Sequence, residues 1–239
     1  MILLTFAVAV LAGATAAIAG FGVGSLLTPL LAARLGTGLA VAAVAIPHAV
    51  ASALRGWRLR SAIDWSVLRG FGVLSAAGGL AGGLLYARLG NRILTAILGV
   101  LLIATAIAGV SGWTGRWRPG GWRAHLLGIL SGLFGGVVGN QGGLRAAALL
   151  TFGLAPVTFV ATSTMTGLMV DAARTPIYLV RAGESLLGVR DLVIAATAGV
   201  VTGTLLGERL LFGLSADRFR RVIALLIGLV GVLLLVQAF

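Results

Sequence analysis

The residues best suited to bind a charged ligand lie in the segment GNQGGLR, at positions 139–145. Glycines and a pair of side-chain amides interrupt hydrophobic sequence there, and an arginine follows within about one helical turn. A break before a short helix leaves backbone N–H groups unpaired and puts partial positive charge at the helix N-terminus. Glycine lets a ligand approach that end, while amides and a guanidinium add donors suited to oxyanions. We therefore predict an anion site that includes Asn140, Gln141, Gly142, Gly143 and Arg145.

The first half of the chain contains a comparable break, GFGVGSLLTP, at positions 20–29. Its candidate ligands are Gly22, Gly24, Ser25 and Thr28. Brought together near the membrane midplane, the two breaks would hold one anion from two sides. Two simpler interpretations compete with this one. The glycines would only let helices pack closely, and the arginine of the second break would only extend to the membrane interface.

A third group of polar residues lies in one long hydrophobic segment of the second half. Thr162 and Thr164 would offer neutral hydrogen bonds to the anion, or would bond back to their own helix. Asp171 and Arg174 are three residues apart and share a helix face. They form either an ion pair that locks the helix or part of a transport pathway. His48, in the first half, is either a hydrogen-bonded core residue or a proton carrier in coupled transport.

The elements that would position these residues are membrane helices. Hydrophobic residues make up 59% of the 239 positions and charged residues only 10%, against about a quarter in soluble domains. Apolar runs of about 18–20 residues recur, long enough to cross a bilayer. The predicted fold class is an all-α polytopic membrane protein. Its expected segments are 2–19, 25–35, 38–56, 64–87, 92–111, 123–138, 142–152, 156–180, 190–212 and 219–238.

The two halves of the chain resemble each other. GVGSLLTPLLAARLG aligns with GNQGGLRAAALLTFG at a shift of 117 positions, and the following segments correspond. We predict a first transmembrane repeat at 1–111, a linker at 112–122 and a second repeat at 123–239. Each repeat would be a glycine-broken helix or re-entrant hairpin followed by three transmembrane helices, an organisation typical of secondary transporters.

The arginines favour an inverted arrangement of these repeats. If each broken element crosses the membrane once, the arginines are nearly balanced between the two sides. If each is a hairpin, the repeats are inverted, and ten arginines lie on one side of the membrane and five on the other. The ten are Arg55, Arg58, Arg60, Arg116, Arg118, Arg123, Arg209, Arg218, Arg220 and Arg221, and the five are Arg34, Arg88, Arg92, Arg181 and Arg190. The richer side is expected to be cytoplasmic, with both termini outside.

Several other functions are disfavoured by the sequence. The chain has no cysteine, which excludes disulfides and thiolate metal sites. Its arginines mostly end hydrophobic runs, where they set topology and contact lipid rather than nucleic acid. Catalytic and nucleotide-binding motifs are absent, so we expect no enzyme, no cofactor and no metal. The first hydrophobic run has no basic residue before it, which favours a membrane segment over a cleaved signal peptide.

The chain resembles the TauE/SafE family of sulfite exporters. The resemblance rests on the glycine-rich segments GFGVGSLLTPLL and SGLFGGVVGNQGG and on the helices AVAAVAIPHAVASALRGWR and FVATSTMTGLMVDAARTPIY that follow them. It implies a transporter of sulfite or sulfur-containing organic anions with an internal repeat. The chain departs from the family pattern where the substrate would lie. Asn140-Gln141 interrupt the usual glycine triplet, and Ile46-Pro47 replace the expected Thr-Ser.

These observations predict a secondary transporter that exports a small anion, such as sulfite or a sulfonate, across the cytoplasmic membrane. The alternatives are an anion channel and a permease for another small organic solute. The expected partners are the anion and the lipid bilayer, and small-xxx-small surfaces would serve either internal packing or a homodimer.

Overall fold

The computed structural model describes residues 1–20, 22–111, 121–210 and 216–239, so most of the predicted linker lies outside the described residues. Every regular element in these ranges is helical, which confirms the all-α fold class. The first half comprises α1 (Ile2–Ala19), α2 (Val23–Leu35), α3 (Thr37–Arg58), α4 (Trp65–Val67), α5 (Val73–Tyr86) and α6 (Asn91–Ser111). The second comprises α7 (Trp122–Val138), α8 (Gly142–Leu149), α9 (Pro156–Gly188), α10 (Arg190–Leu210) and α11 (Ala216–Ala238).

The predicted segments match these helices closely, with one clear difference. Helix α9 continues to Gly188, whereas the hydrophobic run was expected to end at residue 180. The added turns carry exposed polar residues such as Arg181 and Glu184, so they lack the apolar pattern that marks the rest of the helix. A π-helical turn at Leu68–Gly72 joins α4 to α5 without interrupting the helix.

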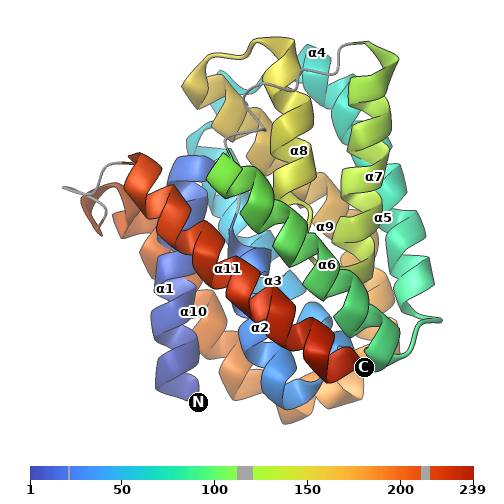
Figure 1. Cartoon of the computed structure of the whole chain (residues 1–239). Coiled ribbons are helices and arrows are strands. Elements are labelled where there is room, and N and C mark those ends of the chain that lie inside the picture. Colours follow the sequence, from blue (N-terminus) through green and yellow to red (C-terminus); the bar gives the residue numbers. More distant parts are fainter. Residues whose placement is uncertain (21, 112–120, 211–215) are drawn as a thin grey trace.

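Four helices among the described residues are long and apolar enough to cross a membrane. They are Thr37–Arg58, Trp65–Tyr86, Asn91–Ala108 and Arg190–Gly207. The paired helices α1 and α2, and α7 and α8, are shorter. Figure 1 shows α1 rising from the N-terminus at the lower end of the molecule and α2 returning toward that end, while α7 descends from the upper end and α8 returns to it. Each pair is therefore a hairpin, and the two hairpins enter from opposite ends of the bundle.

The halves exchange their packing partners. Helix α1 packs along α10, and α7 packs along α5, so each hairpin lies on a helix of the other half. Glycines make these approaches close: a Cβ at Gly203 would meet backbone atoms of Val10 and Ala14. Gly79, Gly83, Gly199 and Gly207 likewise face other helices of the same chain. Of the two roles considered for small-xxx-small surfaces, these five glycines serve internal packing, because their contacts lie within one chain.

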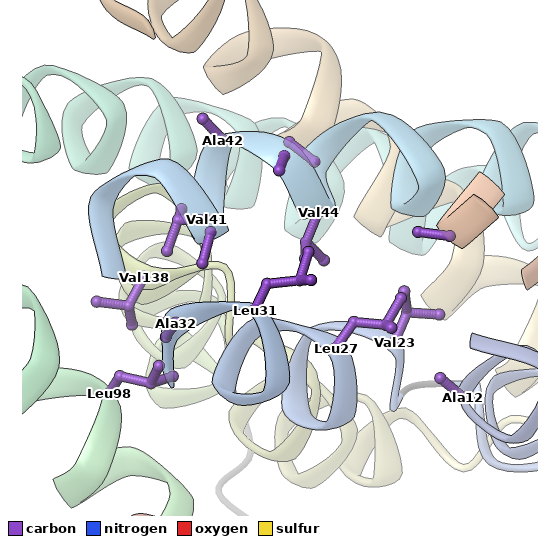
Figure 2. Close-up of a cluster of buried hydrophobic side chains, with 14 of the residues drawn as sticks. Ala12, Val23, Leu27, Leu31, Ala32, Val41, Ala42, Val44, Leu98 and Val138 are labelled. Carbon is purple, nitrogen blue, oxygen red and sulfur yellow. The ribbon is translucent and has the colours of Figure 1, made fainter. Parts of the chain in front are cut away.

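The apolar core lies between the hairpin helix α2 and the long helix α3. Leu27 and Leu31 of α2 are fully buried, and Figure 2 shows them pointing toward α3, from which Val41 and Val44 point back. Leu98 of α6 belongs to the same cluster. This packing fixes the first glycine break against the centre of the bundle, where the polar residues gather.

Exposed tryptophans stand at the end of α3 and at the starts of α4 and α7, and α4 and the start of α7 lie at the upper end of Figure 1. Trp57, Trp65 and Trp122 are more than half exposed, and the Arg60 guanidinium lies 4.6 Å from the ring centre of Trp57. Exposed tryptophans with arginines are typical of the level where hydrocarbon meets lipid headgroups. The N- and C-termini both lie at the opposite end (Figure 1).

Candidate anion-binding site

Both helix breaks use the same backbone device. Gly20 ends α1 in the left-handed conformation with a φ of 76°, and Gly139 ends α7 in the same way with a φ of 73°. Each donates its N–H to the carbonyl four residues earlier, Ala16 and Gly135 respectively. Gly22 also has a positive φ, of 139°. Residues other than glycine rarely adopt these backbone conformations, which explains why glycine occurs at the tips of both hairpins.

The two hairpin tips touch. An added Cβ at Gly24 would meet the carbonyl oxygen of Gly139 and would lie 4.0 Å from the Cα of Asn140. Ser25 Oγ donates to Asn140 Oδ1 at 3.2 Å, with both groups buried. Thr28 Oγ1 would lie 3.5 Å from a Cβ at Gly139. The structure therefore brings the predicted residues of the two breaks together, although they lie more than a hundred positions apart in sequence.

Buried polar atoms without partners cluster around the second break. They are Thr28 Oγ1, Asn140 Nδ2, Gln141 Nε2 and Gln141 Oε1. The backbone carbonyl of Gln141 is satisfied, because it accepts a hydrogen bond from Ser131 Oγ at 2.8 Å. A buried polar group left unpaired costs about 1–3 kcal/mol, so several in one place indicate that water or a ligand completes them. Gly142 and Gly143 open α8 beside these groups, and Gly143 faces Thr105.

Arg145 lies in the first turns of α8 and is only 2% exposed. Its Nε donates to Ser163 Oγ at 3.0 Å, and one terminal nitrogen donates to the Gly20 carbonyl at 3.4 Å. The other terminal nitrogen is buried and has no partner. Among the described residues no carboxylate forms an ion pair with it. The interpretation that Arg145 extends to the membrane interface is wrong, because neighbouring helices enclose the side chain.

The hydroxyl groups at the start of α9 point in different directions. Thr162 Oγ1 accepts a hydrogen bond from the backbone N–H of Asp64 at 3.0 Å, which ties α9 to the start of α4. Thr164 Oγ1 is buried without a partner. Ser163, which was not among the predicted site residues, is the one that contacts the buried arginine of α8. The ligand roles of Thr162 and Thr164 remain predictions.

A second charged cluster joins α3, α7 and α9. Arg174 donates to Asp171 Oδ1 from two nitrogens, at 3.0 and 2.8 Å, as their spacing predicted. Asp171 Oδ2 lies 2.5 Å from Nδ1 of His48 on α3. Arg174 also donates to the Gly135 carbonyl at the end of α7. The sequence predicted the Asp171–Arg174 pair but did not indicate that His48 completes it.

Buried charge in the bundle is mostly positive. In the part of the chain whose burial is described, the buried charged side chains are Arg55, Arg145, Arg174 and Asp171, three arginines against one aspartate, with His48 as a further titratable group. Asp171 is already occupied by Arg174 and His48. Isolated buried charges are costly at membrane depth and are normally paired. Among the described residues, Arg55 and Arg145 have no carboxylate in an ion pair with them.

The described residues form helices alone, and four of these helices are long and apolar enough to cross a membrane, so the protein is an all-α polytopic membrane protein. The sequence profile of the sulfite exporter TauE/SafE family matches residues 5–234, nearly the whole chain. The chain therefore belongs to this family, which is a family of membrane transporters. Comparison with curated proteins and with solved structures finds no match.

Proposed function

We propose that the protein is a secondary transporter that exports a small oxyanion, sulfite or a related sulfonate, across the cytoplasmic membrane. The observation that carries the proposal is Arg145 of α8, which is buried against the first hairpin tip at Gly20 and against Ser163 of α9 and has one terminal nitrogen unpaired. Its fork would bind an oxyanion in two parallel hydrogen bonds. The N–H groups that open α8, at Gly142 and Gly143, would add donors and partial positive charge.

Neutral groups at the contact between the hairpin tips would select the anion by its shape. Asn140 Nδ2 and Gln141 Nε2 are amide donors without partners there, and Ser25 and Thr28 offer hydroxyls from the other hairpin. A ligand bound here would contact both halves of the chain. The two hairpins enter from opposite ends (Figure 1), so rocking one half against the other would open the site to each side in turn. The inside-negative potential favours export of a monoanion by about 2.3 kcal/mol per 100 mV.

Efflux of radiolabelled sulfite from proteoliposomes under an imposed potential tests the proposal. We expect Arg145→Ala to reduce voltage-driven efflux at least about tenfold, because a charge-assisted hydrogen bond is lost. Arg190→Ala is the matched control, since Arg190 is exposed and its pairing with Asp191 spans 3.7 Å. Equal efflux in wild type and Arg145→Ala would assign this arginine a structural role. Single-channel currents would instead identify an anion channel, and protection from heat by neutral analogues alone would identify a permease for an uncharged solute.

We further propose an orientation with both termini outside the cytoplasm. In Figure 1, α4 and the start of α7 lie at the upper end, while both termini lie at the other end. The exposed Arg58 and Arg60 lie just before α4 in the chain, and the exposed Arg123 lies in the first turn of α7. The sequence assigns ten arginines to the side of Arg58, Arg60 and Arg123 and five to the other side, so by the positive-inside rule the first of these sides faces the cytoplasm. A reporter fused after Phe239 that is active only outside the cytoplasm is expected to give signal. A cytoplasmic reporter that is active at the same position would overturn this orientation.

A further inference from the structure

Arg55 is a second buried arginine without an ionic partner. It lies in the last turns of α3 and is 5% exposed. Its terminal nitrogens reach Thr204 Oγ1 on α10 and Ser52 Oγ on its own helix, both at 3.5 Å, the long limit of a hydrogen bond. Its Nε is buried without a partner. Among the described residues no carboxylate lies within ion-pair distance of it. The sequence had suggested only a topology signal at this position.

The position of Arg55 connects it to the anion site. His48, Ser52 and Arg55 recur at positions i, i+4 and i+7, so they share one face of α3. Helix α3 packs against both α9 and α10. Gly56, the residue after Arg55, faces Met165 of α9. In sequence Met165 lies between Ser163 and Gly167, the two α9 residues that lie against the Arg145 guanidinium. The two arginines therefore belong to one buried charged region.

The charge of this region is compensated only in part. Asp171 is the one buried carboxylate among the described residues, and it already holds Arg174 and His48. Arg55 and Arg145 are left with hydroxyl and carbonyl partners, which carry no net charge. A bound monoanion would neutralise one of these arginines. A bound dianion would neutralise both.

We propose that the site binds a doubly charged small oxyanion and that Arg55 is the residue that selects dianions over monoanions. The proposal rests on the anion transport proposed above and specifies its substrate class. In sulfite transport the bound form would then be SO₃²⁻ rather than hydrogen sulfite. Arg145 would hold either anion, while Arg55 would supply the second positive charge. Arg55 is thus assigned a role in specificity and not in anchoring.

Sulfate and methanesulfonate make a suitable probe pair, because they are similar in size and shape but carry two charges and one. Their affinities for the purified full-length protein would be measured by calorimetry at constant ionic strength. We expect wild type to bind sulfate about tenfold to a hundredfold more tightly than methanesulfonate. Arg55→Gln should bring this ratio close to one by weakening sulfate alone, and Arg55→Lys should preserve most of it. Arg190→Gln, an exposed control, should leave the ratio unchanged.

Each outcome separates the two proposals. A wild-type ratio near one, or an Arg55→Gln variant that weakens both anions equally, overturns the selectivity role and leaves anion transport standing. Folded wild-type protein that binds neither anion, nor sulfite, overturns the proposed function itself. If Arg55→Gln does not fold, the ratios in wild type and Arg55→Lys still decide the question. A site that selects by charge requires that wild type and Arg55→Lys each bind sulfate more tightly than methanesulfonate.

Discussion

Replacing Asp171 by alanine is expected to lower the free energy of unfolding by about 3–5 kcal/mol, the usual cost of removing one partner from a buried ion pair. Asp171 is fully buried, receives two hydrogen bonds from Arg174 and lies 2.5 Å from His48. Its loss would leave the Arg174 charge buried beside the Gly135 carbonyl and the Tyr178 ring. It would also remove the contact between His48 of α3 and Asp171 of α9. The midpoint of thermal unfolding, followed by gel filtration in detergent, measures the effect.

Two further variants make this expectation specific. Asp191→Ala removes the same group from an exposed, 3.7 Å ion pair, and we expect a change of at most about 1 kcal/mol. Asp171→Leu combined with Arg174→Met replaces the buried pair by apolar side chains and should be less destabilising than Asp171→Ala. If Asp171→Ala unfolds at the wild-type temperature, the cluster of His48, Asp171 and Arg174 does not stabilise the bundle.

Much of the fold could be predicted from the sequence because its determinants are local. Hydrophobic runs mark the helices, and glycines that need a positive φ mark the breaks at Gly20 and Gly139. The ion pair between Asp171 and Arg174 follows from helical spacing alone. These features depend on neighbours within a few residues, so a single sequence contains the information needed to find them.

Contacts across the chain could not be predicted in the same way. His48 and Asp171 are 123 positions apart, and their contact depends on how α3 packs against α9. Ser163 and Thr162 are adjacent, and which of them faces the buried arginine depends on the rotation of α9 about its axis. Arg55 ends a hydrophobic run, where arginine ordinarily faces lipid headgroups. Only the packing of α10 shows that its side chain is enclosed.

The repeat organisation depends both on local sequence features and on contacts across the chain. The hairpins enter from opposite ends (Figure 1), and the packing of α1 on α10 corresponds to that of α7 on α5. Such an exchange is expected of two related halves that interlock. It also means that neither half could bury its hairpin alone, because each hairpin's main contact is with the other half. We therefore propose that the two halves form a single folding unit, and the division into repeats remains a prediction.

Replacing Gly24 by alanine is expected to separate the two hairpin tips. The added Cβ would meet the Gly139 carbonyl oxygen and would lie 3.2 Å from the Gly139 carbonyl carbon. Backbone on both sides leaves no flexible side chain to move aside, so the helices themselves must shift. Overpacking of this kind costs about 1–3 kcal/mol. The shift would also disturb the Ser25–Asn140 hydrogen bond and the groups around Arg145.

This variant tests whether contact between the tips is required for transport. Sulfite efflux and thermal unfolding would be measured together, with Gly183→Ala as the control. Gly183 lies inside α9 with open space around it, and alanine there should stabilise the helix by up to about 1 kcal/mol. We expect Gly24→Ala to lose efflux while remaining folded, because the tips carry the proposed site and the overpacking costs only about 1–3 kcal/mol. Wild-type efflux and stability in Gly24→Ala would show that the two tips do not have to touch, and the anion would then be held by the second hairpin alone.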